Sequence, residues 1–261
     1  MHLYHRFPQT VALLTVLAVA TVSYADSDKD RLGVGSPAPS LDVEHWISNG
    51  DGKFEPVKEF ESGRVYVVEF WATWCPPCVA SMPNLSKLQQ KYQDKGLQIV
   101  SISDEDLETV QAFLKRNVDG QDSRTFAQVT SNYCLTTDPD SSSQVEYLKA
   151  AQQDGIPAAF IVGKSGVIEW IGHPLEIDEP RDQVITDRWD RVAYIKEKEA
   201  EEKTAAEIEK RVREAIRSMR DGDTDKATET LDALIVEFAN HPAIDQLKGL
   251  RFQIQLSLGG E

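Results

Sequence analysis

The sequence has few basic residues, few histidines and few cysteines, and each shortage removes a class of function. Its 28 Lys and Arg stand against 43 Asp and Glu, which gives a formal net charge of −15 at pH 7. Nucleic acids require a basic face, so we expect no nucleic-acid partner and a soluble protein with a solvated surface. The five histidines and three cysteines supply no second ligand pair at a zinc spacing, so we expect no metal.

Long apolar runs are missing beyond the start of the chain. Residues 1–6 are polar and positive, residues 10–22 form an apolar core, and Ser23-Tyr24-Ala25 is a small-x-small cleavage pattern. We therefore predict a signal peptide over residues 1–25 and a periplasmic or other extracytoplasmic location. The core is short for a membrane span, and an uncleaved N-terminal anchor is the alternative. No cysteine follows the core, which argues against a lipoprotein anchor.

Two of the three cysteines, Cys75 and Cys78, lie where a predicted strand ends and a predicted helix begins. Residues 65–71 are apolar and β-branched except for Glu69, which is typical of a strand buried on both faces. The first turn of a helix favours an anion through its free N–H groups and the positive end of its dipole. We therefore expect Cys75 to ionise readily and act as the nucleophile in disulfide exchange, and Cys78 to resolve the mixed disulfide.

The residues around the pair modify this chemistry. Pro76 and Pro77 suit the start of a helix and stiffen the loop, but they lack N–H groups. Only the amide of Cys78 clearly remains as a donor to Cys75, so we expect a moderately lowered thiol pKa and leave the redox poise open. Burial should raise the pKa of the Glu69 carboxyl, which suits an acid/base for Cys78. A purely structural bond to the backbone is the alternative for Glu69.

A lone C-x-x-C pair also occurs in structural disulfides, in half zinc sites and in haem-attachment sites. Haem attachment needs a histidine after the second cysteine, and Val79 stands there. The third cysteine, Cys134, lies in a predicted strand, and a small buried hydrophobe is the favoured interpretation over a redox role.

The sequence Trp74-Cys75-Pro76-Pro77-Cys78 after a buried strand resembles the thioredoxin superfamily, and its surroundings resemble the extracytoplasmic TlpA/ResA-type branch. The resemblance implies that Glu69 relays protons to and from Cys78. Trp71 and Trp74 match the two tryptophans of the family, and Pro83 matches the proline in its first active-site helix.

A second segment carries the same resemblance. Gly155-Ile156-Pro157 is similar to the cis-proline loop of the family, and X–Pro bonds are the ones that readily adopt the cis form. The resemblance implies that Trp74, Pro76, Ile156 and Pro157 contact an extended substrate. Ala158-Ala159 departs from relatives, which often carry threonine there.

The resemblance implies a thiol-disulfide oxidoreductase with no cofactor other than its own redox-active Cys75–Cys78 disulfide. It implies a reductase for disulfides of exported proteins, such as apocytochrome c in cytochrome c biogenesis or a copper-site protein. Electrons would come from a membrane thiol-disulfide donor. Because direction depends on the potential of the pair against its partners, an oxidase or isomerase stays open.

Two further alternatives have different signatures. A peroxiredoxin-type peroxidase carries a threonine three residues before its reactive cysteine, and Ala72 stands there for Cys75 while Thr73 is out of register. A protein-interaction scaffold would use the C-terminal part of the chain and would not need the intact dithiol.

The order of predicted elements is that of a thioredoxin fold over residues 26–190, a mixed central sheet with helices on both faces. The resemblance to TlpA-type proteins implies a short N-terminal β-hairpin within residues 32–58 in front of it. Further strands are predicted at 97–103, 132–136, 157–162 and 167–171, and helices at 79–95, 104–117 with Asp104 as cap, and 144–153. Residues 119–130 are predicted to be loop or edge.

Residues 191–261 differ in composition and are predicted to form an all-helical extension. Helices are expected at 193–221, 224–239 and 243–258. The run 215–242 resembles part of a tetratricopeptide-type hairpin, but only one copy is present and such repeats normally stack in threes. We expect this extension to dock on the core or on a protein partner, with a binding groove as the alternative.

Overall fold

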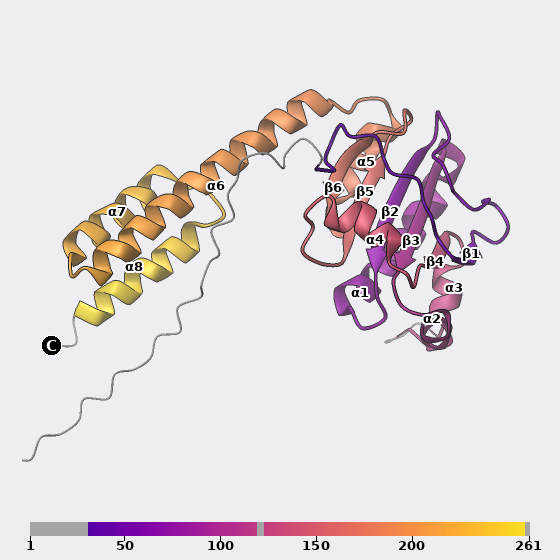
Figure 1. Ribbon diagram of the computed structural model, residues 1–261, viewed down its shortest axis with the longest axis horizontal. Helices are drawn as coiled ribbons and strands as arrows, with labels where there is room; N and C mark the ends of the chain where they lie inside the picture. The colour runs from indigo at the N-terminus through magenta and orange to yellow at the C-terminus, as the bar shows by residue number, and fades with distance from the viewer. Residues whose placement is uncertain (1–30, 119–122, 259–261) are drawn as a thin grey trace, which may run out of the picture.

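The computed structural model describes residues 31–118 and 123–258, and it contains a six-stranded sheet in the order β1-β4-β3-β2-β5-β6 (Figure 1). The predicted signal peptide, residues 1–25, lies outside the described residues. The strands are β1 (His45–Asn49), β2 (Val65–Trp71), β3 (Leu97–Ser103), β4 (Cys134–Thr137), β5 (Ala158–Val162) and β6 (Ile168–Gly172).

The central strand is β2, and all seven of its residues are buried. It pairs in parallel with β3 and antiparallel with β5, and β4 continues the parallel part beyond β3. The two edge strands, β1 and β6, are antiparallel to their neighbours. The structure thus confirms the predicted mixed sheet. Strands covered on both faces have nearly continuous apolar sequences, which is why the bounds of β2 and β3 follow from the sequence.

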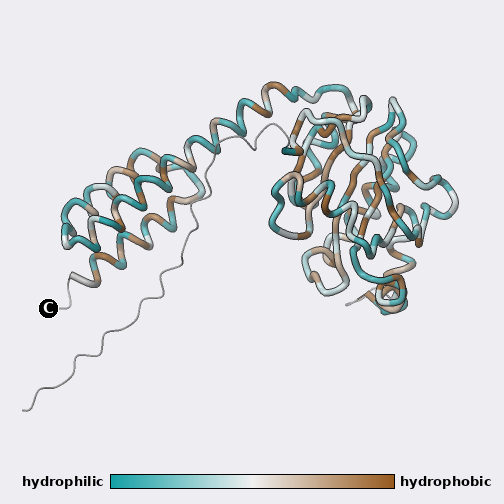
Figure 2. Tube along the Cα trace, viewed as in Figure 1, coloured by the Kyte–Doolittle hydropathy of each residue, from teal (hydrophilic) through white to brown (hydrophobic). Residues whose placement is uncertain are grey.

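Helices cover both faces of this sheet, as predicted. One buried cluster joins the sheet to α1 (Pro76–Tyr92), α2 (Leu107–Leu114), α3 (Phe126–Thr130) and α5 (Asp178–Ile185). The other joins the opposite face to the segment before β2 and to the π-helical turn η2 (Val145–Lys149), which follows α4 (Ser142–Gln144). The short helices η1 (Gln93–Lys95) and η3 (Pro174–Glu176) complete this part. Figure 2 shows the hydrophobic stretches of the chain gathered in the sheet.

The predicted N-terminal β-hairpin is wrong. The segment 32–58 contributes one strand, β1, and its partner is β4 rather than the chain that follows it. The predicted turn forms, with Gly50 and Gly52 at positive φ. After the turn, however, Phe54 and Val57 are buried in the cluster on one face of the sheet, and β1 covers the free edge of β4.

Three local predictions also need correction. Helix α2 begins after Asp106, whose carboxylate accepts from Thr109 N at 2.8 Å, so Asp106 rather than Asp104 is the cap. The predicted loop at 119–130 contains α3, which a capping box between Thr125 and Gln128 begins. The helix predicted at 144–153 is shorter and divides into α4 and η2.

The C-terminal extension is helical, as predicted, and consists of α6 (Arg191–Arg220), α7 (Thr224–Glu237) and α8 (Ile244–Leu258). It has a buried cluster of its own, formed by all three helices. Figure 1 shows α6 leading from the sheet to this unit. At the start of α6, Arg191 forms two hydrogen bonds with the carboxylate of Glu169 on β6. Among the described residues, no helix has the length and apolarity needed to cross a membrane.

Candidate active site

The two cysteines form a disulfide at the N-terminus of α1, with an S–S distance of 2.00 Å and a Cα–Cα distance of 5.3 Å. Cys75 is the N-cap, and Pro76 and Pro77 occupy the first turn. The sulfur of Cys75 accepts a hydrogen bond from Cys78 N at 3.3 Å. The amide of Cys78 is therefore the donor that the two prolines leave, as the sequence predicts.

The surface around the pair is made by neighbours of Cys75. Cys78 is fully buried and Cys75 is 3% exposed, whereas Trp74 is 69% exposed and Pro76 is also exposed. An attacking partner can therefore approach the pair only from the side of Cys75. This asymmetry places Cys75 on the outer side of the pair and Cys78 on the inner side.

The predicted proline loop faces Cys75. The Ile156–Pro157 peptide bond is cis, and the carbonyl oxygen of Ile156 lies 3.8 Å from the sulfur of Cys75. Both loop residues are half-buried. Next to the loop, Trp74 and Ile156 line a cavity of about 510 Å³, which Val145 and Leu148 also line. The four predicted substrate-contacting residues thus lie in two segments, 74–76 and 156–157, that meet at Cys75.

The predicted acid/base, Glu69, is 1% exposed in the middle of β2. Val67 and Trp71, which flank it on the same face of the strand, belong to the buried cluster that contains Cys78. One oxygen, Oε2, accepts a hydrogen bond from Ser101 on β3, and the other, Oε1, has no partner among the described residues. Burial raises the pKa of Glu69 to about 8, against the opposing effect of the Ser101 hydrogen bond.

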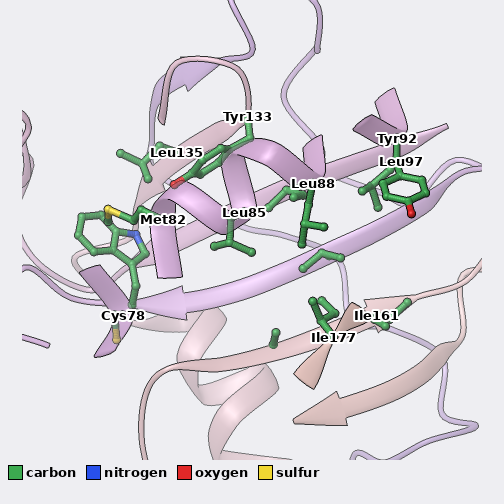
Figure 3. Close-up of a cluster of buried hydrophobic side chains, with 14 of the residues drawn as sticks. Cys78, Met82, Leu85, Leu88, Tyr92, Leu97, Tyr133, Leu135, Ile161 and Ile177 are labelled. Carbon is green, nitrogen blue, oxygen red and sulfur yellow. The ribbon is translucent and has the colours of Figure 1, made fainter. Parts of the chain in front are cut away.

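Figure 3 shows how α1 is anchored over the sheet behind the pair. Met82 and Leu85 follow Cys78 along the helix and are buried with it. Pro83 lies inside α1. This packing fixes the N-terminus of the helix, and therefore Cys75, relative to β2.

Sequence reasoning missed a carboxylate that holds the loop before the pair. Glu105, just after β3, accepts hydrogen bonds from the backbone N and the hydroxyl of Thr73, both at 2.6 Å. Ser103 donates to the same carboxylate at 3.1 Å. The only available signal was that β2 and β3 are parallel neighbours, so that the residues after both strands meet at one edge of the sheet.

The third cysteine lies away from this site. Cys134 is fully buried in the cluster on the opposite face of the sheet, where Gln98 Nε2 is 3.4 Å from its sulfur. Burial raises the pKa of its thiol to about 11. This environment agrees with the interpretation of Cys134 as a small buried hydrophobic residue. Over residues 31–118 and 123–258, no group of three His, Cys, Asp or Glu side chains is arranged to hold a metal.

Comparison with curated proteins finds relatives among thiol-disulfide oxidoreductases. The chain is 28% identical to protein FixW of Rhizobium leguminosarum over 158 residues, 60% of this chain and 68% of that protein. It is 34% identical over 99 residues to the thiol-disulfide oxidoreductase ResA of Oceanobacillus iheyensis, and 27% identical over 166 residues to that of Geobacillus thermodenitrificans. These matches cover 37% and 62% of this chain, and 51% and 84% of the two relatives. The chain thus spans about half the length of the ResA of Oceanobacillus iheyensis.

Comparison with solved structures finds a thiol:disulfide interchange protein of Chlorobium tepidum TLS, with 22% identity and a TM-score of 0.41. That alignment covers 59% of this chain and 98% of the other. The AhpC of Mycobacterium tuberculosis aligns with a TM-score of 0.45 and 18% identity, over 61% of this chain and 99% of that one.

The family follows from a match to a sequence-family model. The model of the AhpC/TSA family matches residues 34–171, which is more than half of the chain of 261 residues. This range contains the whole sheet except the last residue of β6, as well as the cysteine pair and the cis-proline loop. The chain therefore belongs to the AhpC/TSA family.

Proposed function

We propose that the protein is a thiol-disulfide oxidoreductase that reduces disulfides of exported proteins through Cys75 and Cys78. The observation that carries the proposal is the position of the Cys75 sulfur at the first turn of α1, 3.8 Å from the cis-proline loop. The relatives named thiol-disulfide oxidoreductase ResA support the same chemistry.

The exchange starts from the reduced dithiol. The thiolate of Cys75 attacks one sulfur of a substrate disulfide, and the other substrate sulfur leaves as a thiolate that takes up a proton. The thiol of Cys78 then loses its proton, and its thiolate attacks the sulfur of Cys75. The substrate leaves with two thiols, and the protein is left with the Cys75–Cys78 disulfide, which is the state that the structure shows. Two electrons pass to the substrate, and a thiol donor must return them.

We assign Glu69 as the base that accepts the proton of Cys78. With a pKa of about 8, a minor but useful fraction of its carboxyl is ionised near neutral pH and can accept that proton. An exposed glutamate would be a weaker base, because its pKa lies near 4.5. The raised pKa is therefore what fits the residue to this task.

The substrate segment is proposed to lie against Trp74, Pro76, Ile156 and Pro157. The exposed indole of Trp74 and the half-buried Ile156 offer apolar contact on the two sides of Cys75. Backbone groups of the proline loop can pair with an extended chain, in the manner of strand addition. The neighbouring cavity of about 510 Å³ leaves room for a side chain of that segment.

The cellular setting is part of the proposal. We place the protein in the periplasm or another extracytoplasmic space, delivered by a signal peptide, with an uncleaved anchor as the alternative. The expected partners are exported proteins with disulfides, including those of cytochrome c biogenesis, and a membrane thiol-disulfide electron donor. No cofactor beyond the redox-active disulfide is needed for the exchange.

The C-terminal helices are proposed to bind a protein partner. They fold around their own buried cluster, and Phe252 and Leu256, one turn apart on α8, are 59% and 61% exposed. The resemblance to a tetratricopeptide hairpin stays a prediction. Substituting Phe252→Ser should leave the reduction of a small disulfide substrate unchanged and weaken capture of the partner.

The decisive experiment compares wild-type protein with Cys75→Ser in the reduction of insulin by dithiothreitol. We expect acceleration by the wild type and none by the variant, while equal inactivity of both would favour the scaffold alternative. A parallel assay with a hydroperoxide tests the peroxidase alternative, for which Ala72 lacks the required hydroxyl. Faster turnover of the hydroperoxide than of insulin would overturn the proposal.

A further inference from the structure

Three buried polar atoms behind the cysteine pair have no hydrogen-bond partner among the described residues. They are Glu69 Oε1, Trp71 Nε1 and Tyr133 OH, and their side chains are 1%, 0% and 0% exposed. Buried polar groups in native proteins are nearly always bonded, either to protein atoms or to an ordered water. Because all three lie in or beside the buried cluster that contains Cys78, we look for a common explanation.

The sheet places the three side chains on one face. Glu69 and Trp71 are two residues apart on β2 and so point to the same side. Glu69 is paired with Ser101 of β3, and Ser101 is paired with Leu135 of β4. Tyr133 lies in the bend just before β4. Its side chain is buried in the same cluster as Leu135, Trp71 and Cys78, on the face to which Glu69 points.

The orientation of Tyr133 agrees with this placement. Figure 3 shows its ring lying beside α1, with the hydroxyl directed toward Met82, which is one turn after Cys78. The negative charge of Glu69 adds to burial in raising the pKa of Tyr133 well above its ordinary value, so the two groups interact. The hydroxyl therefore keeps its proton and stays a donor over the whole range in which Glu69 titrates.

The three atoms are chemically complementary. Trp71 Nε1 is only a donor, Tyr133 OH is a donor and acceptor, and a carboxylate oxygen is an acceptor. A buried water needs two to four polar partners, and here it can accept from Trp71 and Tyr133 while donating to Glu69 Oε1. Ser101 already donates to the other oxygen, Oε2.

We propose that Tyr133 is a positioning residue for Glu69: its hydroxyl, together with the Trp71 indole, holds one buried water that donates to Glu69 Oε1. The inference rests on the proposed role of Glu69 in proton transfer and adds a residue to it. The water completes the hydrogen bonding of the carboxylate, so that both oxygens are held when Glu69 is ionised. The assembly thereby makes the ionised form accessible inside an apolar cluster.

Loss of the Tyr133 hydroxyl should therefore raise the pH at which Glu69 ionises. Among the described residues, Tyr133 from the bend before β4 interacts electrostatically with Glu69, and Cys78 from α1 lies in the buried cluster on the same face. Ser101 from β3 does not titrate. Working with the oxidised protein removes Cys78 from the problem, since a disulfide sulfur carries no proton. Any change on substituting Tyr133 then belongs to Glu69.

The test is Tyr133→Phe, with Tyr147→Phe as the matched control. Tyr147 is equally buried but lies in the cluster on the opposite face, where its hydroxyl donates to Pro39 O at 2.5 Å. The side-chain carboxyl of Glu69 is titrated by ¹³C NMR in the oxidised protein, and its signal is assigned by its loss in Glu69→Gln. We expect a midpoint about one pH unit higher in Tyr133→Phe, as for the loss of one hydrogen bond to a charged group, and no change in Tyr147→Phe.

An unchanged midpoint in Tyr133→Phe would overturn the inference. A second measurement does not depend on any variant: a crystal structure of the oxidised protein should show a water within about 3.2 Å of both Glu69 Oε1 and Tyr133 OH. An empty space between these atoms would equally overturn it. Turnover separates this inference from the proposed proton relay. Normal turnover of Glu69→Gln would refute the relay, but the shift of the Glu69 midpoint in Tyr133→Phe could still be observed.

Discussion

Replacing Glu69 by glutamine should make the protein more stable at alkaline pH and leave its stability almost unchanged in acid. The pKa of Glu69 is about 8 in the folded protein, against 4.5 for an unperturbed glutamate. Between these values the folded state binds a proton that the unfolded chain has released, so the free energy of unfolding falls as pH rises. The stabilisation by protonated Glu69 is complete below about pH 4.5 and lost above about pH 8, and it amounts to roughly 5 kcal/mol at most.

The assay is urea denaturation of the oxidised wild type and Glu69→Gln, followed by tryptophan fluorescence between about pH 4 and pH 9. Glutamine keeps an oxygen that can accept a hydrogen bond from Ser101, but it cannot ionise. The free energy of unfolding of the variant should therefore not show the decrease with rising pH that is expected for the wild type. Its advantage over the wild type should grow from near zero at the acid end to several kcal/mol at the alkaline end. Glu59→Gln, an exposed glutamate, serves as the control and should show no such trend.

A difference between Glu69→Gln and wild type that does not change with pH would refute the reasoning. It would mean that Glu69 ionises at an ordinary pH despite its burial. Its assignment as the base for Cys78 would then lose its physical support. A difference that shrinks as pH rises would have the opposite sign and would refute it more strongly.

Three further predictions concern the exchange itself. In reduced protein at neutral pH, iodoacetamide should modify Cys75 faster than Cys78, and equal rates by mass spectrometry would contradict the helix-terminus argument. Cys78→Ser should accumulate mixed disulfides with substrates through Cys75, visible on non-reducing gels, whereas Cys75→Ser should capture none. Glu69→Gln should slow steady-state reduction of insulin by roughly a hundredfold, at the lower end of general-base effects, and an unchanged rate would remove Glu69 from the site.

The loop contact that the sequence did not reveal can be tested separately. Glu105→Ala removes the acceptor of both Thr73 hydrogen bonds and should lower the free energy of unfolding by about 1–3 kcal/mol. Glu108→Ala, an exposed change on α2, is the control. Equal denaturation midpoints for the two variants would show that the Thr73 contact does not contribute to stability.

The parts of the fold that sequence could predict are those in which a local pattern is sufficient. The buried strands β2 and β3 follow from continuous apolar runs. The prolines after Cys75 indicated a helix start beside the pair, although α1 begins at Pro76 and not at residue 79 as predicted. The site was predictable to the same degree, because its chemistry-bearing residues lie in two short motifs. Glu69 was detectable as the one charge in an apolar strand.

The parts that sequence could not predict depend on contacts between distant segments. The partner of β1 is decided by the free edge of β4, about ninety residues away, and not by the turn that follows β1. Helix α3 has five residues, too few to show a helical period, and only its capping box marks it. The contact of Glu105 with Thr73 and the approach of Tyr133 to Glu69 exist only once β4, β3 and β2 lie side by side.

The central claim is that the helix terminus makes Cys75 the reactive thiol, and its direct test is the thiolate titration of the reduced protein. Ultraviolet absorbance of the thiolate is followed against pH in wild type and in Cys75→Ser. The account predicts a thiol that ionises below the ordinary pKa of about 8.5 and disappears in Cys75→Ser. A Cys75 that ionises at or above that value would contradict it, because burial would then outweigh the helix N-terminus and the Cys78 amide.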